Sequence, residues 1–211
     1  TLEWDDRFAV FSTTGGAVTV NGNQAITGIQ FLADGYTLTP GQGSALTIAN
    51  AATPFRVDQG ATATIDTPIT GAGGLDKQDG GVLALNGVNT YAGGTTISGG
   101  ALRVNSDAAL GAADGNISLA GGVLSIGGTA FNSTDRAIAL GNAGGGIEVV
   151  DAANTFTVDD NLTGSGAFTK QGAGTLVLTG TNSYTGGTSV AGGTLAGNTN
   201  SLKAAIGTQT G

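Results

Sequence analysis

Two adjacent carboxylates, Asp159 and Asp160, come closest to a catalytic pair in this sequence. Enzymes that cleave polysaccharides gather Asp and Glu side chains on one face, as general acid, base or nucleophile. Neighbours in a strand point to opposite faces, so at most one of the pair could join a given site. We therefore expect both to lie in a solvated turn, and the sequence predicts no catalytic residue.

Other groups that could hold a ligand are sparse. Residues 3–7 (EWDDR) place charges around the only Trp, which fits a terminal cap or a ring that stacks on a sugar. Asp76 ends a near match to the Gly-rich calcium repeat, and Asp114 begins a DGN triplet that lacks the further acidic ligands of a calcium loop. The chain has no His and no Cys, and no Gly-rich segment carries a phosphate-loop Lys. We expect no metal and no cofactor.

The composition indicates a folded, charge-poor chain. Gly accounts for 40 of 211 residues, hydrophobic residues for 39% and charged residues for only 10%, whereas about 25% of an ordinary domain is charged. A net charge of −8 without a basic stripe argues against binding to nucleic acid or to an anionic membrane surface. No run of about 18 apolar residues is present, so we expect no direct membrane insertion.

Short strands, and almost no helices, follow from the periodicity. Apolar residues alternate with small or polar ones in segments such as 83–85, 102–104, 124–126 and 176–178, and Gly, Asn, Asp and Thr bound them. No helical period extends over ten or more residues. The best helix candidates are the short segments 106–110 and 201–206.

A long repeat organises these strands. Residues 70–104 align without a gap with residues 163–197, at an offset of 93 and with 17 of 35 positions identical. The match extends upstream, so the copies are 62–104 and 155–197. A shorter turn-and-strand unit recurs every 19 to 28 residues from residue 80 onward, both within the copies and between them. A β-sandwich lacks such a self-similar step, whereas a parallel β-helix of about 20 to 25 residues per coil requires it.

We therefore predict an all-β, single-stranded parallel β-helix of about nine or ten coils over residues 1–211. The chain begins at Thr1 without a leader and is interpreted as one segment of a longer protein. Leu176, Leu178, Val190 and Leu195 are predicted core layers. Tyr91 and Tyr184, at matched places in the two copies, are expected over a corner or at the edge of an inner column.

One charged dipeptide is kept in both copies. It is Lys77-Gln78 in the first and Lys170-Gln171 in the second. Two readings stay open: a solvated corner or edge residue, or a regular contact strip along the rod.

The stretch GAGTLVLTGTNSYTGGTSVAGGTL, residues 172–195, closely resembles the passenger-associated repeat of bacterial autotransporters. Residues 79–102 match the same pattern with departures at Asp79 and Val82. The resemblance implies a right-handed parallel β-helix, export through a C-terminal outer-membrane barrel that this chain does not include, and display at the bacterial cell surface or release from it. In that family the repeat is stem material, and effector activity usually lies in another domain.

Three hypotheses for function remain. The first is a structural stem that supports export and display. The second is an adhesive or self-associating surface that binds a host or a sister rod. The third, a polysaccharide-acting enzyme, lacks a catalytic constellation, so we expect no enzyme in this segment.

Overall fold

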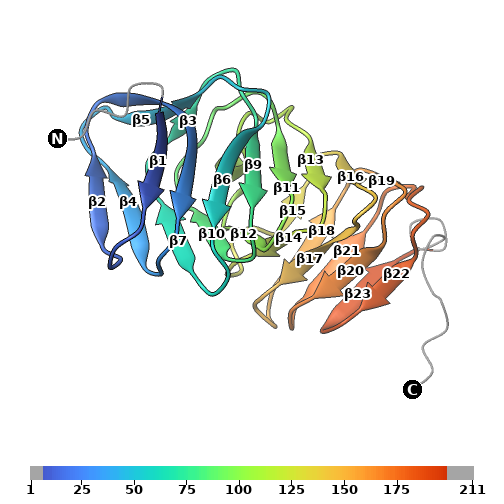
Figure 1. The fold of residues 1–211 in the computed structure, drawn as a ribbon. Helices are drawn as coiled ribbons and strands as arrows, with labels where there is room; N and C mark the ends of the chain where they lie inside the picture. Colours follow the sequence, from blue (N-terminus) through green and yellow to red (C-terminus); the bar gives the residue numbers. More distant parts are fainter. Residues whose placement is uncertain (1–6, 199–211) are drawn as a thin grey trace.

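Parallel strands stack coil upon coil along one axis in the computed structural model, which describes residues 7–198 (Figure 1). Each strand pair in this part of the chain is parallel. Successive coils run from the N-terminal end to the C-terminal end of an elongated body. The predicted all-β solenoid is confirmed.

A nine-stranded sheet counts the coils, because each coil contributes one strand to it. Consecutive strands of this sheet begin 19 to 26 residues apart, close to the predicted step. Its members are β2 (Ala17–Val20), β4 (Tyr36–Pro40), β7 (Thr62–Ile65), β10 (Val82–Leu85), β12 (Ala101–Val104), β14 (Val123–Ile126), β17 (Gly145–Val149), β20 (Phe168–Gln171) and β22 (Thr188–Val190).

A ten-stranded sheet forms a second face. Its long strand β3 turns a corner: the first half pairs with β5, and the second half lies between β1 and β6. The members are β1 (Arg7–Phe11), β3 (Asn23–Phe31), β5 (Ala45–Ile48), β6 (Thr53–Val57), β8 (Ile69–Thr70), β9 (Leu75–Gln78), β11 (Thr95–Ile97), β13 (Ile117–Leu119), β16 (Ile138–Leu140) and β19 (Leu162–Gly164).

A third face completes the coil. A four-stranded sheet covers its C-terminal part, with β15 (Ser133–Thr134), β18 (Thr155–Val158), β21 (Thr175–Leu178) and β23 (Thr194–Gly197). One coil departs from strand geometry here and contains the 3-10 helix η1 (Asp107–Leu110), which lies within the predicted helical segment 106–110. The other predicted helix, 201–206, lies outside the described residues.

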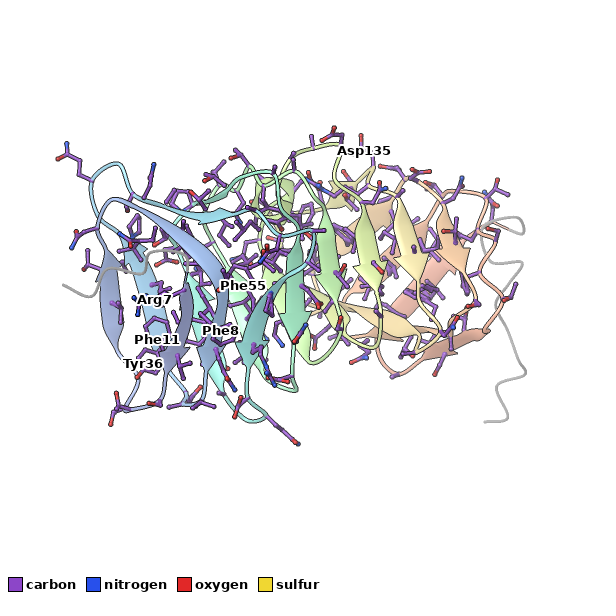
Figure 2. The ribbon with its side chains drawn as sticks, turned by 45° about the horizontal axis from the view of Figure 1, so that its top comes forward. Arg7, Phe8, Phe11, Tyr36, Phe55 and Asp135 are labelled. Carbon is purple, nitrogen blue, oxygen red and sulfur yellow. The ribbon has the colours of Figure 1, made fainter. Side chains whose placement is uncertain are left out.

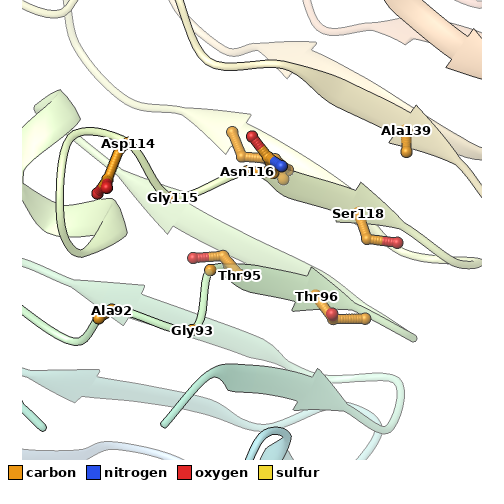
Figure 3. Close-up of a pocket in the computed structure, with 11 residues that line it drawn as sticks. Ala92, Gly93, Thr95, Thr96, Asp114, Gly115, Asn116, Ser118 and Ala139 are labelled. Atoms are coloured by element: carbon orange, nitrogen blue, oxygen red, sulfur yellow. The ribbon is translucent and has the colours of Figure 1, made fainter. Parts of the chain in front are cut away.

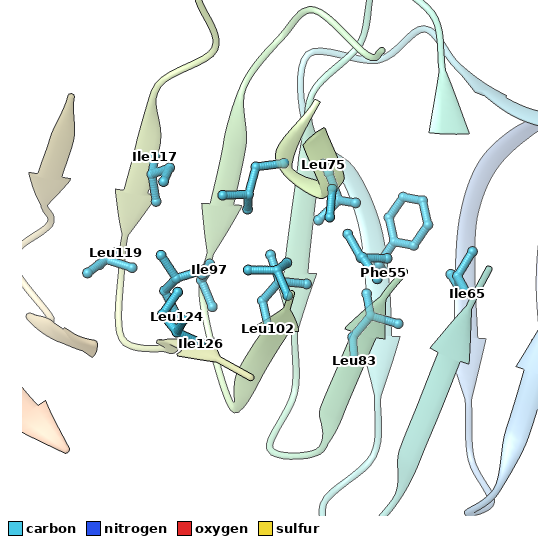
Figure 4. Packing of buried hydrophobic residues seen from close by; sticks show 14 of the residues in the cluster. Phe55, Ile65, Leu75, Leu83, Ile97, Leu102, Ile117, Leu119, Leu124 and Ile126 are labelled. Carbon is cyan, nitrogen blue, oxygen red and sulfur yellow. The ribbon is translucent and has the colours of Figure 1, made fainter. Parts of the chain in front are cut away.

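The core is a set of apolar columns parallel to the axis (Figure 4). Alternation sends every second side chain of a strand inward, and in-register stacking places each one on its counterpart in the next coil. The predicted inward residues of segments 83–85, 102–104, 124–126 and 176–178 are all buried. Tyr91 and Tyr184, predicted over a corner or at the edge of an inner column, are also buried, at 0% and 1% exposure.

Glycines form corners where backbone passes close to backbone. Gly100 has a φ of +57°, and a Cβ built on it would lie 2.2 Å from the carbonyl oxygen of Gly81. Gly193, its counterpart in the second copy, has a φ of +62° and the same 2.2 Å approach, to Gly174. No side chain fits either corner, which explains why the pattern keeps glycine there.

The last described coil is less covered than its counterpart in the first copy. Ile97 and Leu102 are fully buried, with β13 and β14 stacked beside them. Val190 and Leu195 occupy the matched positions in β22 and β23, and there Val190 is 36% exposed and Leu195 only partly buried. The prediction that both are core layers was wrong for Val190 in this structure, because within residues 7–198 a coil covers its side chain on one side only.

Aromatic side chains fill the N-terminal coils (Figure 2). Phe11 stacks on Phe31 with ring centroids 5.0 Å apart, and Tyr36 is tilted against both. On the outer surface, the ring of Phe8 lies where a Cβ on Gly28 would be, 2.6 Å away. Phe8 is 40% exposed and shields the backbone of β3 at that point.

Candidate functional site

The two copies of the repeat lie on different faces of the solenoid. In the first copy β9 and β11 belong to the ten-stranded sheet and β10 and β12 to the nine-stranded sheet. The matching strands β20 and β22 belong to the nine-stranded sheet, and β21 and β23 to the four-stranded one. An offset of 93 residues is therefore not a whole number of coils, and the second copy begins one face further round the axis. Residues shared by the copies cannot form a strip along one face.

Lys77 occupies an inward position of β9, in the middle of an apolar column. Strand register places it between Phe55 of the preceding coil and Ile97 of the next, and its side chain is 0% exposed. The full column runs Ile29, Phe55, Lys77, Ile97, Leu119 and Leu140. The expectation of a solvated corner was wrong, and so was that of a contact strip. Lys77 is two residues after the inward Leu75, and residues two apart in a strand point to the same face. This spacing could have indicated that Lys77 is buried.

Three backbone carbonyls hold the Lys77 ammonium. Nζ donates to the oxygen of Gln78 at 2.7 Å, of Asp79 at 2.9 Å and of Gly99 at 3.1 Å. An ammonium has three donors and no acceptor, so its hydrogen-bonding capacity is filled. Gln78 ends β9, Asp79 lies on the corner that follows, and Gly99 lies on the equivalent corner of the next coil. The side chain therefore ties two stacked corners from inside.

Lys170 repeats the arrangement on another face. It lies inward on β20 beside Ile147, is 0% exposed, and donates to Gln171 at 2.6 Å, Gly172 at 2.9 Å and Gly192 at 3.0 Å. Gly172 replaces Asp79, and both have positive φ, +75° and +63°. Asp is one of the few side chains that tolerates this region, which accounts for the departure from the pattern in the first copy.

Burial changes the acid–base behaviour of these groups. It lowers the pKa of Lys77 to about 8, against partial compensation by the charges of Asp79 and Asp76. Burial also lowers the pKa of Lys170, with Glu148 opposing it. The described hydrogen bonds of both amines go to backbone carbonyls of their own corner and of the next one. These lysines are structural donors.

A second shared group binds neighbouring coils on the opposite side of the repeat. The Asn89 side chain accepts from the amide of Ile69 at 2.8 Å and donates to the carbonyl of Ala109 at 2.6 Å, so it spans three coils. Asn182 accepts in the same way from the amide of Leu162 at 2.7 Å. Buried Tyr91 shares a hydrogen bond with Thr95 at 2.7 Å, and Tyr184 does so with Thr188. Lys, Asn, Tyr and Thr of the repeat thus all bond within or between coils.

Arg136 organises the coil that departs from strand geometry. Its side chain is 1% exposed and pairs with Asp107 at 2.8 Å. Seven hydrogen bonds in all leave the guanidinium, to both carboxylate oxygens of Asp107 and to the carbonyls of Asp107, Leu110, Gly111, Ala112 and Gly115. The residues between β12 and β13 are therefore folded around one buried cation.

Comparison with known proteins shows which family has this sequence repeat. The model of the passenger-associated transport repeat matches residues 75–104 and 168–196. Adhesin BmaC autotransporter of Brucella suis biovar 1 (strain 1330) is 42% identical over 176 residues, which are 79% of this chain and 5% of that protein. The chain belongs to the autotransporter passengers. It spans a small part of the length of this relative, and no solved structure matches it.

The carboxylates considered for chemistry are dispersed in this passenger segment. Asp159 and Asp160 lie in the turn after β18, where one accepts from Thr179 at 3.2 Å and the other from the amide of Asn161 at 2.7 Å. Asp76 is nearly buried and accepts from Ser98 and Gln78, both at 2.6 Å. No group of three or more possible metal ligands exists within residues 7–198.

Positions 3–6 of the charged N-terminal run, including Trp4, lie outside the described residues. Arg7 begins β1. Over the described part of the passenger segment, none of the helical structure has the length and apolarity needed to span a membrane.

A polar hollow of about 320 Å³ opens beside the loop between β12 and β13 (Figure 3). We call this segment the Arg136 loop, because the Arg136 side chain holds it. Asp114 and Asn116 line it from the loop, on either side of Gly115, and Thr96 and Ser118 line it from β11 and β13. Figure 3 shows the loop above Ala92 and Gly93 of the preceding coil. The sequence singled out Asp114 only as an incomplete calcium triplet and gave no sign that these four side chains share one cavity.

Proposed function

We propose that this chain is one segment of the stem of a longer passenger. In the full-length protein the stem would be exported through a C-terminal outer-membrane barrel and would hold an adhesive region away from the cell surface. Neither a barrel nor an effector domain would lie in residues 1–211. Long-repeat copies 62–104 and 155–197 would be successive units of the same rod.

The rotation of the repeat by one face is the observation that supports this proposal most strongly. A repeat that carried a binding site would present it on one side, in register along the axis. Here Lys77 lies on the ten-stranded sheet and Lys170 on the nine-stranded sheet, yet each makes the same three internal bonds. The residues that the sequence repeats are therefore those that hold one coil on the next, and every face of a solenoid needs such contacts.

Catalysis has no support in this segment, and we propose that it is not an enzyme and needs no cofactor. The carboxylates are separated and bonded to turns, and the relative with 42% identity is named an adhesin. Turnover of a polysaccharide or an ester by the isolated 211 residues would contradict this part of the proposal.

Deleting whole coils from the full-length protein tests the stem function. Removing residues 75–94 joins Gly74 to Thr95, so β11 takes the place of β9 beside β6. The passenger should then be shorter by one coil but still reach the surface and stay protease-resistant. Removing only residues 75–84 breaks the register, and the truncated passenger should be degraded or retained.

The same pair of deletions distinguishes the adhesive alternative. That alternative has one supporting observation, the name of the similar Brucella protein. If the whole-coil deletion leaves display intact but abolishes attachment of the bacteria, this segment carries a contact surface and is not stem alone. Self-association predicts concentration-dependent dimers in analytical ultracentrifugation, and a strictly monomeric rod counts against it.

A further inference from the structure

The hollow beside the Arg136 loop gathers several polar side chains in one place. Some outward side chains of adjacent coils bond one another, as Thr47 does with Thr70 at 3.2 Å and Ser125 with Glu148 at 2.6 Å. Within the described residues, the side chains of Asp114, Asn116, Thr96 and Ser118 bond to no protein group. Four polar side chains with free capacity therefore line one cavity.

The cavity is built by rigid elements. Parallel strands β11 and β13 hold Thr96 and Ser118 in register as direct neighbours. On the other side Arg136 donates to Ala112 at 2.7 Å and to Gly115 at 2.9 Å, which fixes the loop that carries Asp114.

Two glycines that line the hollow bring the loop and the strand close together. A Cβ on Gly94 would lie 2.9 Å from the carbonyl oxygen of Asn116, and one on Gly115 would lie 3.4 Å from the Cα of Gly94. Backbone packing at these glycines fixes the loop against the strand. Sites held before binding lose less freedom when a ligand enters.

Charge and chemistry limit the ligand. The hollow has a carboxylate and no cation, and the nearby Arg136 has its donors committed to seven bonds. Phosphate, sulfate and acidic sugars would meet repulsion without a counter-charge. A metal ion would find a single carboxylate, too few hard ligands for calcium. The apolar lining consists of Ala and Gly residues and of Ile117, whose side chain is buried in the core, so no broad apolar surface is offered to a lipid or a large aromatic group.

Hydroxyl groups of a neutral sugar match what remains. A carboxylate accepts two hydroxyl donors, an amide both donates and accepts, and the Thr and Ser hydroxyls do either. The volume is at the lower end of small-molecule sites. We propose that this hollow is a subsite for one unit of a neutral carbohydrate, with Asp114 and Asn116 as its main contacts. This site is an addition to the stem function and does not depend on it.

Amide chemical shifts of the ¹⁵N-labelled 211-residue protein test the proposal. Methyl galactoside and methyl glucoside, added to high millimolar concentration, should shift the signals of Gly93, Gly94 and Gly115 and leave distant coils unchanged. N-acetylneuraminic acid should cause no such shift. Lactose and maltotriose, as a galactose-terminated glycan and a glucan, then distinguish two sources of the sugar. Absence of localised shifts with every neutral sugar would overturn the proposal.

Matched variants connect binding to the cavity. Asp114→Ala should weaken binding about tenfold through the loss of charged hydrogen bonds, whereas Asp135→Ala removes an equally exposed acid elsewhere and should change nothing. Ala139→Phe should block the hollow, whereas Thr163→Phe places the same ring at the paired position of β19, outside it. Equal effects of either pair would show that the sugar binds elsewhere. Circular dichroism of each variant checks that the fold, and with it the stem function, is intact.

Discussion

The ammonium nitrogen of Lys77 lies 3.1 Å from the carbonyl oxygen of Gly99, one coil further along the axis. This bond joins two glycine-rich corners of adjacent coils, in addition to the hydrogen bonds between the strands. Lys170 makes the equivalent bond to Gly192 on a different face. A charged residue that recurs in a repeat, and that looks like a surface feature, is here an internal fastener.

Replacing Lys77 with Met keeps most of the side-chain volume but removes the donor. Three carbonyl oxygens then lose this donor, and the free energy of unfolding should fall by about 3 kcal/mol. Urea unfolding followed by circular dichroism measures the change. Arg103→Met, on the exposed face of β12, is the control and should cost under about 0.5 kcal/mol. Equal losses in the two variants would contradict the internal role of Lys77.

Alkaline pH should reveal the same group. The pKa of Lys77 is lowered by burial to about 8 from an ordinary value of 10.5. Between these values the unfolded chain binds more protons, so stability should rise with pH from about 8. Burial raises the pKa of Tyr91 from 10.0 to about 12, so above pH 10 the tyrosine should reverse the trend. Thermal unfolding across this range should therefore show a maximum near pH 10. Lys77→Met should have a shallower rising limb, and the remainder is expected from Lys170, whose pKa is also lowered by burial. An unchanged rising limb in this variant would contradict the assignment to Lys77.

Removing the buried Arg136 side chain should lower the free energy of unfolding strongly, because it holds the loop between β12 and β13. Arg136→Leu strands Asp107 and the carbonyls of the loop, with an expected loss of about 3 to 5 kcal/mol. Burial raises the pKa of Asp107, but hydrogen bonds from Arg136 and Thr134 and the charge of Arg136 outweigh it, and the pKa is lowered overall. The stabilisation from this carboxylate should thus be complete above its ordinary pKa of 3.8 and be lost as the pH falls through the lower folded value. Acid unfolding of the wild type and Asp107→Asn checks this, and identical acid limbs would refute it.

Two glycines with similar φ angles allow the cost of backbone strain to be measured separately from the cost of a steric clash. Gly128 has a φ of +62° and no atom within 4 Å of a built Cβ, whereas Gly100 has a φ of +57° and a carbonyl oxygen at 2.2 Å. Gly128→Ala should cost about 1 kcal/mol, from backbone conformation alone. Gly100→Ala should cost at least about 3 kcal/mol, because the corner must also move. Chemical denaturation of both variants gives the comparison, and equal costs would mean that the corner is easily displaced.

The sequence was informative wherever one coil repeats the physics of another. Alternation and a 19-to-28-residue step indicated the solenoid, and the inward position of Leu83 or Leu176 followed from parity alone. The same alternation places Lys77 inward, but we predicted an exposed side chain because of its charge. A lysine is rarely buried unless all its donors have partners. Those acceptors are backbone carbonyls, which leave no trace in a list of residues.

Features made by a single coil could not be predicted. The hollow at Asp114 arises because Arg136, more than twenty residues later, folds the preceding coil around its guanidinium. No copy of that loop exists in the repeat, so the sequence marked the DGN triplet and the short helix but not the cavity. The incomplete burial of Val190 has a similar origin, since parity gives the direction of a side chain but not whether another coil covers it.

Labelling of lysine amines tests the central claim, that the repeat conserves internal stacking contacts, most directly. The native protein is treated with acetic anhydride near neutral pH, and modification of each lysine is read by peptide mass spectrometry. We predict that Lys77 and Lys170 stay unmodified until the protein is unfolded by denaturant, and then react together. Reaction of both at the rate of a free amine in the native protein would place them on the surface and contradict the account.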